Sequence, residues 1–540
     1  MSDLLIQNAE IADGSGDPPF IGDIFVQNGR IAEIRKKGEE RGRKGMGSGE
    51  WWPGYSGVSC DAAGLTAVPG FIDIHRHGDL VPFGSGEEAE ELRQGITFFM
   101  NGSCGFSPVP SRGEFFGLLQ SYARPIMGAI PDHLRGMDFA AFRRALEQMP
   151  LYSNMGCLCG GGALRIAVKG FDNSPMSAAE MDSLSGLLEG ELDAGAFGLS
   201  LGLMYAPENF YSIEELEKIC RIPARRGLPV AVHLWQEGNG LFDSIEKIIA
   251  LAKKSGAAIH ISHLKITGKQ NWGKIGRALD RIVCARKEGL DITFDAYPYN
   301  AGSTALYALL PPARLNRGPA ELIESLREPQ MRRAIAAELQ DANAAWDNVV
   351  PGIGWQGVAI SGGRDASLSG LSVRDIAAGR GCSPEDCVFD LLLENDGNIS
   401  VIIFSMDEAD VEKVLGFPGA IVISDSLYAG NLPHPRRFGS QARFLSRYAA
   451  ALGFEKALCS VTSLPARRFG LKDRGLLRAG AVADIVLLDR ALLRDTAVWE
   501  APAQYPQGIA RVFVSGKQAF NEQEGPVGKY GRLATYEGAA

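Results

Sequence analysis

The spacing of apolar positions changes twice along the chain. Near the start, "LLIQNAEIADG" and "GDIFVQNGRIAEI" carry short β-type runs, and Asn28-Gly29 is typical of a hairpin turn. From about residue 66 to 435, apolar runs alternate with helical segments. After about residue 475, β-type runs return in "AGAVADIVLLDR" and "ARVFVSGKQAF". The pattern predicts a central α/β region with a β-rich segment at each end.

Capping signals mark helix starts within the central region. Ser177 and Ser212 each precede a glutamate at the spacing of a capping box, and Ser383-Pro384 places proline at a first helical position. Apolar strands follow these helices in "LPVAVHL", "AAIHISHLKI", "LDITFDAYPY" and "AIVISDS". Strands alternating with helices predict a parallel sheet, and the number of units favours a barrel over an open sheet.

The fold expected from this pattern is α/β, a (β/α)8 TIM barrel with a small β-sandwich domain. Residues 66–474 would form the barrel, with an insertion or lid within about 306–420. Residues 1–65 and 475–540 would pair into the sandwich, because chain termini often lie close together. The Gly-rich and charged residues 36–57 are expected to form an exposed insertion.

Composition narrows the class of protein. With 45% hydrophobic residues the chain can bury a large core, and its net charge of −9 is spread along the sequence, which argues against a nucleic-acid partner. No apolar stretch approaches the ~20 residues of a membrane helix, and no signal peptide is evident. Nine irregularly spaced cysteines favour a reduced, cytoplasmic protein without a disulfide framework. The oligomeric state is left open.

Histidine positions give the first indication of chemistry. The chain has only seven histidines, yet His75 and His77 face the same way at the end of one predicted strand. Barrel strands end at the face where active sites are built, and two imidazoles there can bind one metal ion. Three further histidines end or follow predicted strands, namely His233, His263 and His434.

Thiol and carboxyl groups occur at similar positions. Cys104 follows a strand in a tight Gly- and Pro-containing loop, which favours a ligand over an inert thiol. Asp425 ends the strand "IVISD" on its apolar face, where a carboxylate is costly unless paired or bound to metal, so it is the best acid/base candidate. Asp295 is placed likewise, but it can instead orient a neighbour by hydrogen bonding.

Other candidate side chains have structural interpretations. His260 has the opposite parity to His263 and is expected to face the helices, and His133 is expected on the surface. Cys157 and Cys159 form a CxC pair, but the neighbouring glycines favour a packed turn over a metal site.

These residues occur within motifs that resemble a known family. "GFIDIHRHGD" resembles the first-strand signature of the metal-dependent amidohydrolase superfamily. "NGSCGFSPVP", "GLSLGLMYAP", "DAYPYNAGST", "TSLPARRFGL" and "DRGLLRAGAVADIVLLD" are similar to its N-acyl-D-amino-acid deacylase (D-aminoacylase) branch. The motifs extend in order from about residue 65 to 490, nearly the whole chain.

The resemblance implies a zinc site. The tightly bound zinc would be held by Cys104, His233 and His263. A second, weaker metal position would be defined by His75, His77 and Asp425, with Cys104 between the two. Many relatives bridge their metals with a carboxylated lysine, and the matching stretch "AFGLSLGL" has no lysine, which fits the branch in which a cysteine bridges.

The resemblance also implies an activity, the zinc-dependent hydrolysis of N-acyl-D-amino acids to a carboxylic acid and a free D-amino acid. Asp425 would take a proton from the attacking water and deliver it to the leaving amine. The substrate, a small N-acyl amino acid, carries a carboxylate that Arg436 can pair with bidentately and to which Lys265 can add charge. The remaining candidate substrate-binding residues are Tyr297, Tyr299, His434 and Tyr205.

Two departures from the family's pattern bear on the substrate. Relatives often have an arginine where this chain has Trp235, and a histidine where it has Gly161. If both alter a pocket wall, the substrate can instead be a cyclic amide, as in hydantoinases, or a small dipeptide. A third reading keeps the amidohydrolase fold without catalysis, although such a chain would be expected to lose ligands.

Overall fold

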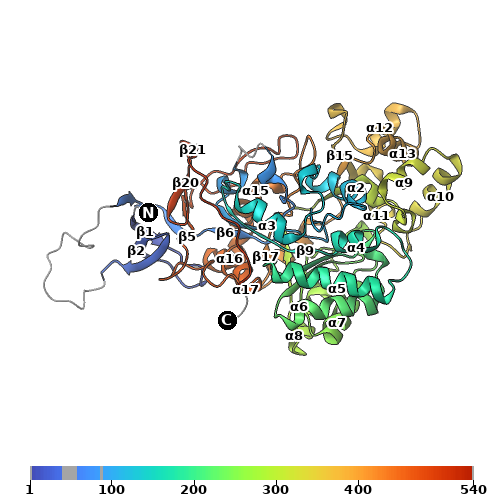
Figure 1. The fold of residues 1–540 in the computed structure, drawn as a ribbon. Helices are drawn as coiled ribbons and strands as arrows, with labels where there is room; N and C mark the ends of the chain where they lie inside the picture. Colours follow the sequence, from blue (N-terminus) through green and yellow to red (C-terminus); the bar gives the residue numbers. More distant parts are fainter. Residues whose placement is uncertain (1–2, 39–56, 85–88, 538–540) are drawn as a thin grey trace.

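The computed structural model describes residues 3–38, 57–84 and 89–537. Most of the insertion predicted at residues 36–57 lies outside the described residues. One end of the molecule is built of strands from both ends of the chain, and the opposite end is formed mainly by helices (Figure 1). Within the described part of the chain, no helix has the length and apolar character to cross a membrane.

A nine-stranded sheet joins the two ends of the chain. β5 pairs with β1 in parallel and with β18 in antiparallel register, so that Ile485 lies opposite Pro69. The sheet has its own hydrophobic cluster, which includes Ile6, Ile24 and Phe513. Because β5 belongs to this sheet, the unit extends beyond residue 65, where the sequence pattern ended it. The strands are β1 (Leu4–Ile11), β2 (Phe20–Gln27), β3 (Arg30–Lys36), β4 (Val58–Asp61), β5 (Thr66–Pro69), β18 (Ile485–Leu488), β19 (Ile509–Val514), β20 (Lys517–Asn521) and β21 (Gly525–Pro526).

Two parallel sheets lie at the centre of the molecule. One has six strands in the order β17-β13-β12-β11-β10-β9, and the other has the order β6-β7-β8. Only Leu158 separates β8 from β9, and a parallel bridge between Arg76 and Ser426 links the segments that follow β6 and β17. The strands are β6 (Phe71–Asp73), β7 (Ile96–Asn101), β8 (Asn154–Cys157), β9 (Cys159–Gly160), β10 (Leu199–Gly202), β11 (Pro229–His233), β12 (Ala258–Ile261), β13 (Ile292–Ala296) and β17 (Ile421–Val422). They are almost wholly buried, as expected of parallel strands covered on both faces.

Helices connect these strands, and several begin where the sequence predicted. Ser177 and Ser212 form capping boxes with Glu180 and Glu215, and Ser383 caps the helix that starts at Pro384. Each cap satisfies amide groups that the first helical turn leaves free. The helices are α1 (Glu90–Arg93), α2 (Phe116–Met127), α3 (Phe139–Glu147), α4 (Gly161–Lys169), α5 (Ala178–Asp193), α6 (Ile213–Arg225), α7 (Leu241–Ser255), α8 (Ile275–Lys287), α9 (Pro319–Ser325), α10 (Pro329–Leu339), α11 (Val350–Ile353), α12 (Val373–Arg380), α13 (Pro384–Glu394), α14 (Glu408–Leu415), α15 (Arg436–Arg443), α16 (Phe454–Ser460) and α17 (Ser463–Arg468).

A long segment leaves the parallel sheet between β13 and β17. These two strands pair directly, with Asp295 opposite Ile421, although more than a hundred residues separate them. The intervening chain contains α9 to α13 and an antiparallel sheet in which β16 lies between β14 and β15. The three strands are β14 (Gly302–Ala305), β15 (Val358–Gly362) and β16 (Ser400–Ile403).

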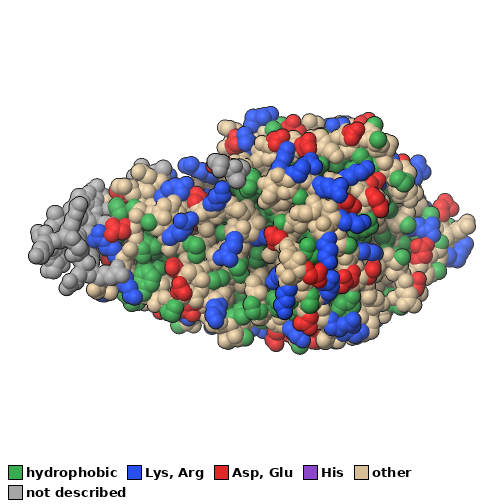
Figure 2. Space-filling model, turned by 90° about the horizontal axis from the view of Figure 1, so that it is seen from below, with side chains coloured by type: hydrophobic (Ala, Val, Ile, Leu, Met, Phe, Trp, Pro, Cys, Tyr) green, Lys and Arg blue, Asp and Glu red, His purple; other side chains and the backbone are tan. Residues whose placement is uncertain are grey.

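Charged side chains of both signs are mixed over the face drawn in Figure 2. Lys and Arg do not gather into a single stripe on that face, which agrees with the dispersed charge of the sequence.

Candidate metal centre

All six side chains predicted as metal ligands meet at the carboxyl ends of the parallel strands. His233 is the last residue of β11, and the other five lie a few residues beyond β6, β7, β12 or β17. Parallel strands bring their carboxyl ends to one side, so residues distant in sequence converge there. The six residues are His75, His77, Cys104, His233, His263 and Asp425.

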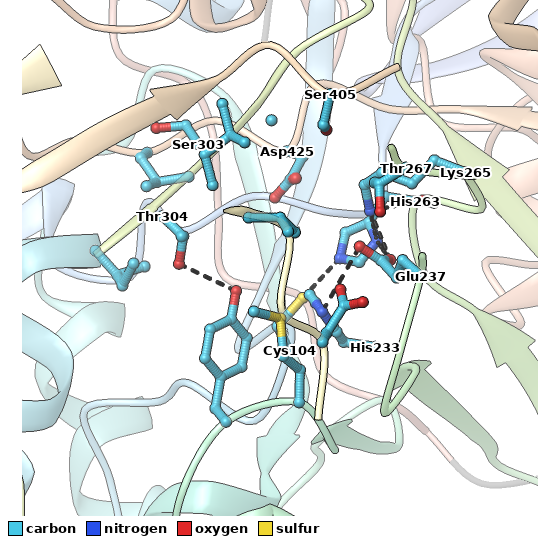
Figure 3. Close-up of a pocket in the computed structure, with 18 of the residues that line it drawn as sticks. Cys104, His233, Glu237, His263, Lys265, Thr267, Ser303, Thr304, Ser405 and Asp425 are labelled. Atoms are coloured by element: carbon cyan, nitrogen blue, oxygen red, sulfur yellow. Dashed lines mark hydrogen bonds and ion pairs between the residues drawn. The ribbon is translucent and has the colours of Figure 1, made fainter. Parts of the chain in front are cut away.

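Cys104 occupies the middle of this cluster. Its Sγ lies 3.2 Å from Nε2 of His75 and 3.3 Å from Nε2 of His263. Three overlapping triads have ligand atoms within 4.8 Å of one another: His75, His77 and Cys104; Cys104, His233 and His263; and His75, His263 and Asp425. In Figure 3, Cys104 and His233 lie close together, and Asp425 lies farther up the same pocket. One thiol is therefore placed to serve two neighbouring metal positions.

The backbone at the cluster is strained. Cys104, His263 and Asp425 have φ angles of 52°, 36° and 50°, a region that side chains other than glycine rarely adopt. The loop around Cys104 is also tight, because a Cβ at Gly102 would lie 2.2 Å from the carbonyl oxygen of Leu158. Gly102, two residues before Cys104, is thus required because any side chain there would collide with this carbonyl oxygen.

Mutual electrostatics favour the ionised forms of these buried groups. Burial alone would raise the pKa of Cys104, but the charges of His75 and His263 hold it well below its usual range. Burial alone would lower the pKa of His75, but Cys104 and then Asp425 raise it well above its usual range. A thiolate surrounded by imidazoles is a ligand set that suits zinc.

Two further carboxylates hold the histidines from behind. Asp295 lies 3.4 Å from Nδ1 of His75 and 2.9 Å from Nε2 of His260, so it orients its neighbours as one of the two sequence interpretations proposed. Glu237 lies 3.0 Å from Nδ1 of His263 and accepts a hydrogen bond from Nζ of Lys265 at 2.6 Å. Carboxylates that bind the outer nitrogen of a histidine fix its orientation and its tautomer.

Asp425 lies within ion-pair distance of two histidines of the cluster and of Arg436. One of its oxygens lies 3.4 Å from Nε2 of His75 and 3.3 Å from Nε2 of His77. The other lies 2.9 Å from Nη1 of Arg436. Burial tends to raise the pKa of Asp425, but Arg436 and then His75 hold it well below its usual range.

A pocket opens over the cluster. Three of the predicted substrate-binding residues line it, namely Lys265, Tyr297 and Tyr205. Tyr205 donates or accepts a hydrogen bond with Thr304 at 3.1 Å, so β14 of the inserted segment contacts the pocket wall (Figure 3). Several lining residues had no signal in the sequence, including Thr267, Ser303, Asp347 and Ser405, because they lie in turns or in the inserted segment.

The other three predicted substrate-binding residues lie outside this lining. Tyr299 donates to Asp495 at 3.1 Å, and Nε2 of His434 lies 2.9 Å from the carbonyl oxygen of Ala301. Arg436 is fully buried. Strand β13 ends at Ala296, so strand alternation stops before both Tyr297 and Tyr299, and only Tyr297 lines the pocket.

The departures noted in the sequence also lie away from the pocket lining. Trp235 is partly buried against Lys247, whose Nζ is 5.7 Å from the ring centre. At Gly161, an added Cβ would lie 2.5 Å from Oε1 of Glu208, which leaves no room for a side chain. The premise that both residues alter the pocket wall is therefore not met.

The remaining sequence interpretations concern structural residues. His260 is buried and contacts Asp295, while His133 is exposed. Cys157 and Cys159 are buried, and burial raises the pKa of both thiols. Among the described residues neither belongs to a candidate metal-ligand group.

Comparison with known proteins gives one consistent family. A sequence profile of the amidohydrolase family matches residues 167–520. The chain is 31% identical to an N-acyl-D-glutamate deacylase of Alcaligenes xylosoxydans xylosoxydans, over 98% of this chain and 96% of that protein.

Solved structures give the same result. An N-acyl-D-glutamate deacylase from Bordetella bronchiseptica, complexed with zinc and a phosphonate mimic of the tetrahedral intermediate, is similar with a TM-score of 0.81 and 29% identity, covering 98% of this chain and 99% of that one. A D-aminoacylase described as having a binuclear metal centre, with one-metal activation and second-metal attenuation, is similar with a TM-score of 0.80 and 28% identity, covering 99% of both chains.

Proposed function

This chain belongs to the amidohydrolase family, and on that premise we propose that it hydrolyses N-acyl-D-amino acids to a carboxylic acid and a free D-amino acid with the help of zinc. One observation carries the proposal: the Sγ of Cys104 lies within 3.3 Å of histidines from two separate strands, at the floor of a pocket that Asp425 also lines. Both relatives named above act, by their names, on this kind of amide.

The donor set fits zinc. Cys104, His233 and His263 offer a thiolate and two imidazoles, and thiolate and imidazole nitrogen are the ligands that zinc prefers. Neither ring nitrogen of His233 has a hydrogen-bond partner among the described residues, although the side chain is buried. Buried polar groups are rarely left unpaired, so we expect a ring nitrogen of His233 to bind a group that is not part of the protein, such as a zinc ion.

We assign the tightly held zinc to Cys104, His233 and His263. A second, weaker position would use His75, His77 and Asp425, with Cys104 shared between the two. Cys104 belongs to two of the three ligand triads, one with His233 and His263 and the other with His75 and His77, which supports this division. When bound, zinc supplies a Lewis acid that polarises the scissile carbonyl and lowers the pKa of water.

Asp425 is proposed as the group that moves protons. As a carboxylate it accepts a proton from the attacking water and then donates it to the leaving nitrogen, because an unprotonated amide anion is a very poor leaving group. Arg436, 2.9 Å from Asp425, favours the ionised form that must accept the first proton. Asp295 and Glu237 hold His75 and His263 in place.

Lys265 and Tyr297 are proposed to hold the substrate. Both line the pocket, and Nζ of Lys265 lies 5.8 Å from the ring centre of Tyr297. A substrate carboxylate can pair with the ammonium group and accept from the phenol, whose oxygen is buried without a hydrogen-bond partner among the described residues. Tyr205 would contact the acyl group.

We also infer that the parallel strands close into a (β/α)8 barrel and that the terminal sheet forms a β-sandwich domain. The two parallel sheets adjoin where only Leu158 separates β8 from β9, and the bridge between Arg76 and Ser426 joins their other edges, which supports closure. The barrel would span about residues 70–474, carrying the segment between β13 and β17 as a lid over the pocket.

A panel assay tests the proposed function. Zinc-loaded protein should release free amino acid from N-acetyl-D-methionine and not from the L form. Asp425→Asn should lower kcat by roughly 100-fold or more while the protein stays folded. Exclusive opening of hydantoin or cleavage of a dipeptide would replace the proposal with one of the alternative substrates, and no turnover of any compound would favour a non-catalytic protein.

A further inference from the structure

The charged groups of the pocket wall are unevenly divided between the two signs. Apart from the histidines, the described residues of the wall include one cation, Lys265, but three carboxyl groups, on Glu237, Asp347 and Asp425. Glu237 is paired with Lys265, and Asp425 lies beside Arg436. Among the described residues, Asp347 forms no such ion pair and accepts instead from the amide of Gly238 at 3.1 Å.

The side chain of Asp347 is buried and packs against Gly238. Only 5% of its surface is exposed, and an added Cβ at Gly238 would lie 3.2 Å from its Oδ1 and 3.1 Å from Oγ1 of Thr267. The absence of a side chain at Gly238 thus lets the carboxyl group pack against the turn that follows Glu237. Burial and then the charge of Glu237 raise the pKa of Asp347 to about 7, so above that pH the group is a carboxylate and opposes a further negative charge nearby.

The rest of the wall offers little to a second carboxylate. Apolar side chains form much of it, namely Phe106, Ile126, Met204, Val349, Ile403 and Leu427. An ionised group that leaves water for such a surface loses its hydration without gaining a partner. A substrate with one carboxylate can place it on Lys265, whereas a second carboxylate finds no second lysine or arginine among the described lining residues and meets apolar groups, neutral hydroxyl groups or Asp347.

We propose that Asp347 determines side-chain specificity, so that the pocket accepts N-acyl-D-amino acids with neutral or basic side chains and rejects those with acidic side chains. This inference rests on the proposed function, since it concerns the second charge of a substrate whose α-carboxylate is held by Lys265. It runs against the likeness to two of the three relatives named above, which are N-acyl-D-glutamate deacylases, while the third is a D-aminoacylase. The charged groups that line this chain's own pocket are the reason to expect rejection of acidic side chains.

The test compares side chains on the zinc-loaded full chain. We expect kcat/KM for N-acetyl-D-methionine to exceed that for N-acetyl-D-glutamate by roughly 100-fold, with N-acetyl-D-lysine between them. Asp347→Asn keeps an oxygen that can accept from Gly238 and removes the charge. It should lower the methionine-to-glutamate ratio by roughly tenfold or more.

Asp410→Asn is the matched control. Asp410 is also buried and accepts from a glycine amide, that of Gly273 at 2.7 Å, but it does not line this pocket. Its variant should keep the wild-type ratio.

Each remaining outcome overturns a stated part of the inference. If wild type hydrolyses the glutamate substrate as well as the methionine one, the selectivity is wrong while the deacylase function stands. If the selectivity is present but Asp347→Asn leaves the ratio unchanged, Asp347 is not its determinant. If no D-substrate is hydrolysed, the inference falls together with the proposed function.

Discussion

The Nη1 atom of Arg436 lies 2.9 Å from Oδ2 of Asp425, and the guanidinium group stacks 4.5 Å from the ring centre of Tyr297. Arg436 has no exposed surface and does not line the pocket. It therefore acts on the substrate through Asp425 and Tyr297 rather than by direct contact. A buried guanidinium in this position stabilises the carboxylate form of Asp425.

This relationship predicts the kinetic effect of Arg436→Met. Loss of the ion pair should lower kcat by roughly tenfold to 100-fold, because the carboxylate of Asp425 loses the partner that positions it, and KM for N-acetyl-D-methionine should change little. Arg436→Lys should recover part of kcat. Steady-state kinetics separate the two parameters, and a large rise in KM at constant kcat would mean that Arg436 binds the substrate carboxylate after all.

Cys104→Ala should remove zinc. The thiolate is shared by two of the three candidate ligand triads, so its loss weakens both metal positions. We expect zinc retained after dialysis to fall by roughly tenfold or more, measured by elemental analysis of the folded protein. Cys159→Ala is the matched control, because Cys159 is equally buried and lies outside the candidate ligand groups of the described residues. Retention of full zinc by Cys104→Ala would contradict the assignment.

Lys265→Met should impair the binding of the substrate carboxylate. KM for N-acetyl-D-methionine is expected to rise by roughly tenfold or more, since Lys265 is the one lysine among the described residues that line the pocket. N-acetyl-D-methioninamide lacks the carboxylate, so the variant should hydrolyse it about as well as wild type does. Lys269→Met, at an exposed lysine on the same loop, should behave like wild type. If the variant lost the same share of activity on both substrates, the substitution would instead have displaced Glu237, which accepts a hydrogen bond from Lys265.

The six side chains of the candidate metal centre could be picked out from sequence because each lies at or just past the end of an apolar strand. His75, His77, His233 and Asp425 follow buried runs whose carboxyl ends must meet, and Cys104 stands between glycines that only a tight turn requires. At these residues the end of an apolar run in the sequence coincides with the carboxyl end of a strand in the fold, so the sequence pattern predicts their position.

Substrate contacts were harder to predict because alternation ends with the strand. Strand β13 ends at Ala296, before Tyr299, and Arg436 begins helix α15, so no strand periodicity fixes where either side chain points, and both are buried outside the pocket lining. Asp347 lies in an irregular segment far from the ligands in sequence, where no periodicity operates. Its position depends on how the inserted segment folds back over the strands, and a single sequence does not encode that as a local pattern.

Glu191 gives a prediction about stability that is independent of the metal centre. It is buried on α5, and burial raises its pKa from the ordinary 4.5 to about 7. Between these values the folded protein binds more protons than the unfolded chain, so the free energy of unfolding falls as pH rises through that window and stays low above it. Glu191→Gln should therefore be more stable than wild type at about pH 8, by up to about 3 kcal/mol, and should lose this advantage at about pH 5.

Urea unfolding at fixed zinc concentration measures the difference, with Glu189→Gln, at a partly exposed position on the same helix, as control. Parallel pH profiles for wild type and Glu191→Gln would mean that Glu191 ionises without cost in the folded protein.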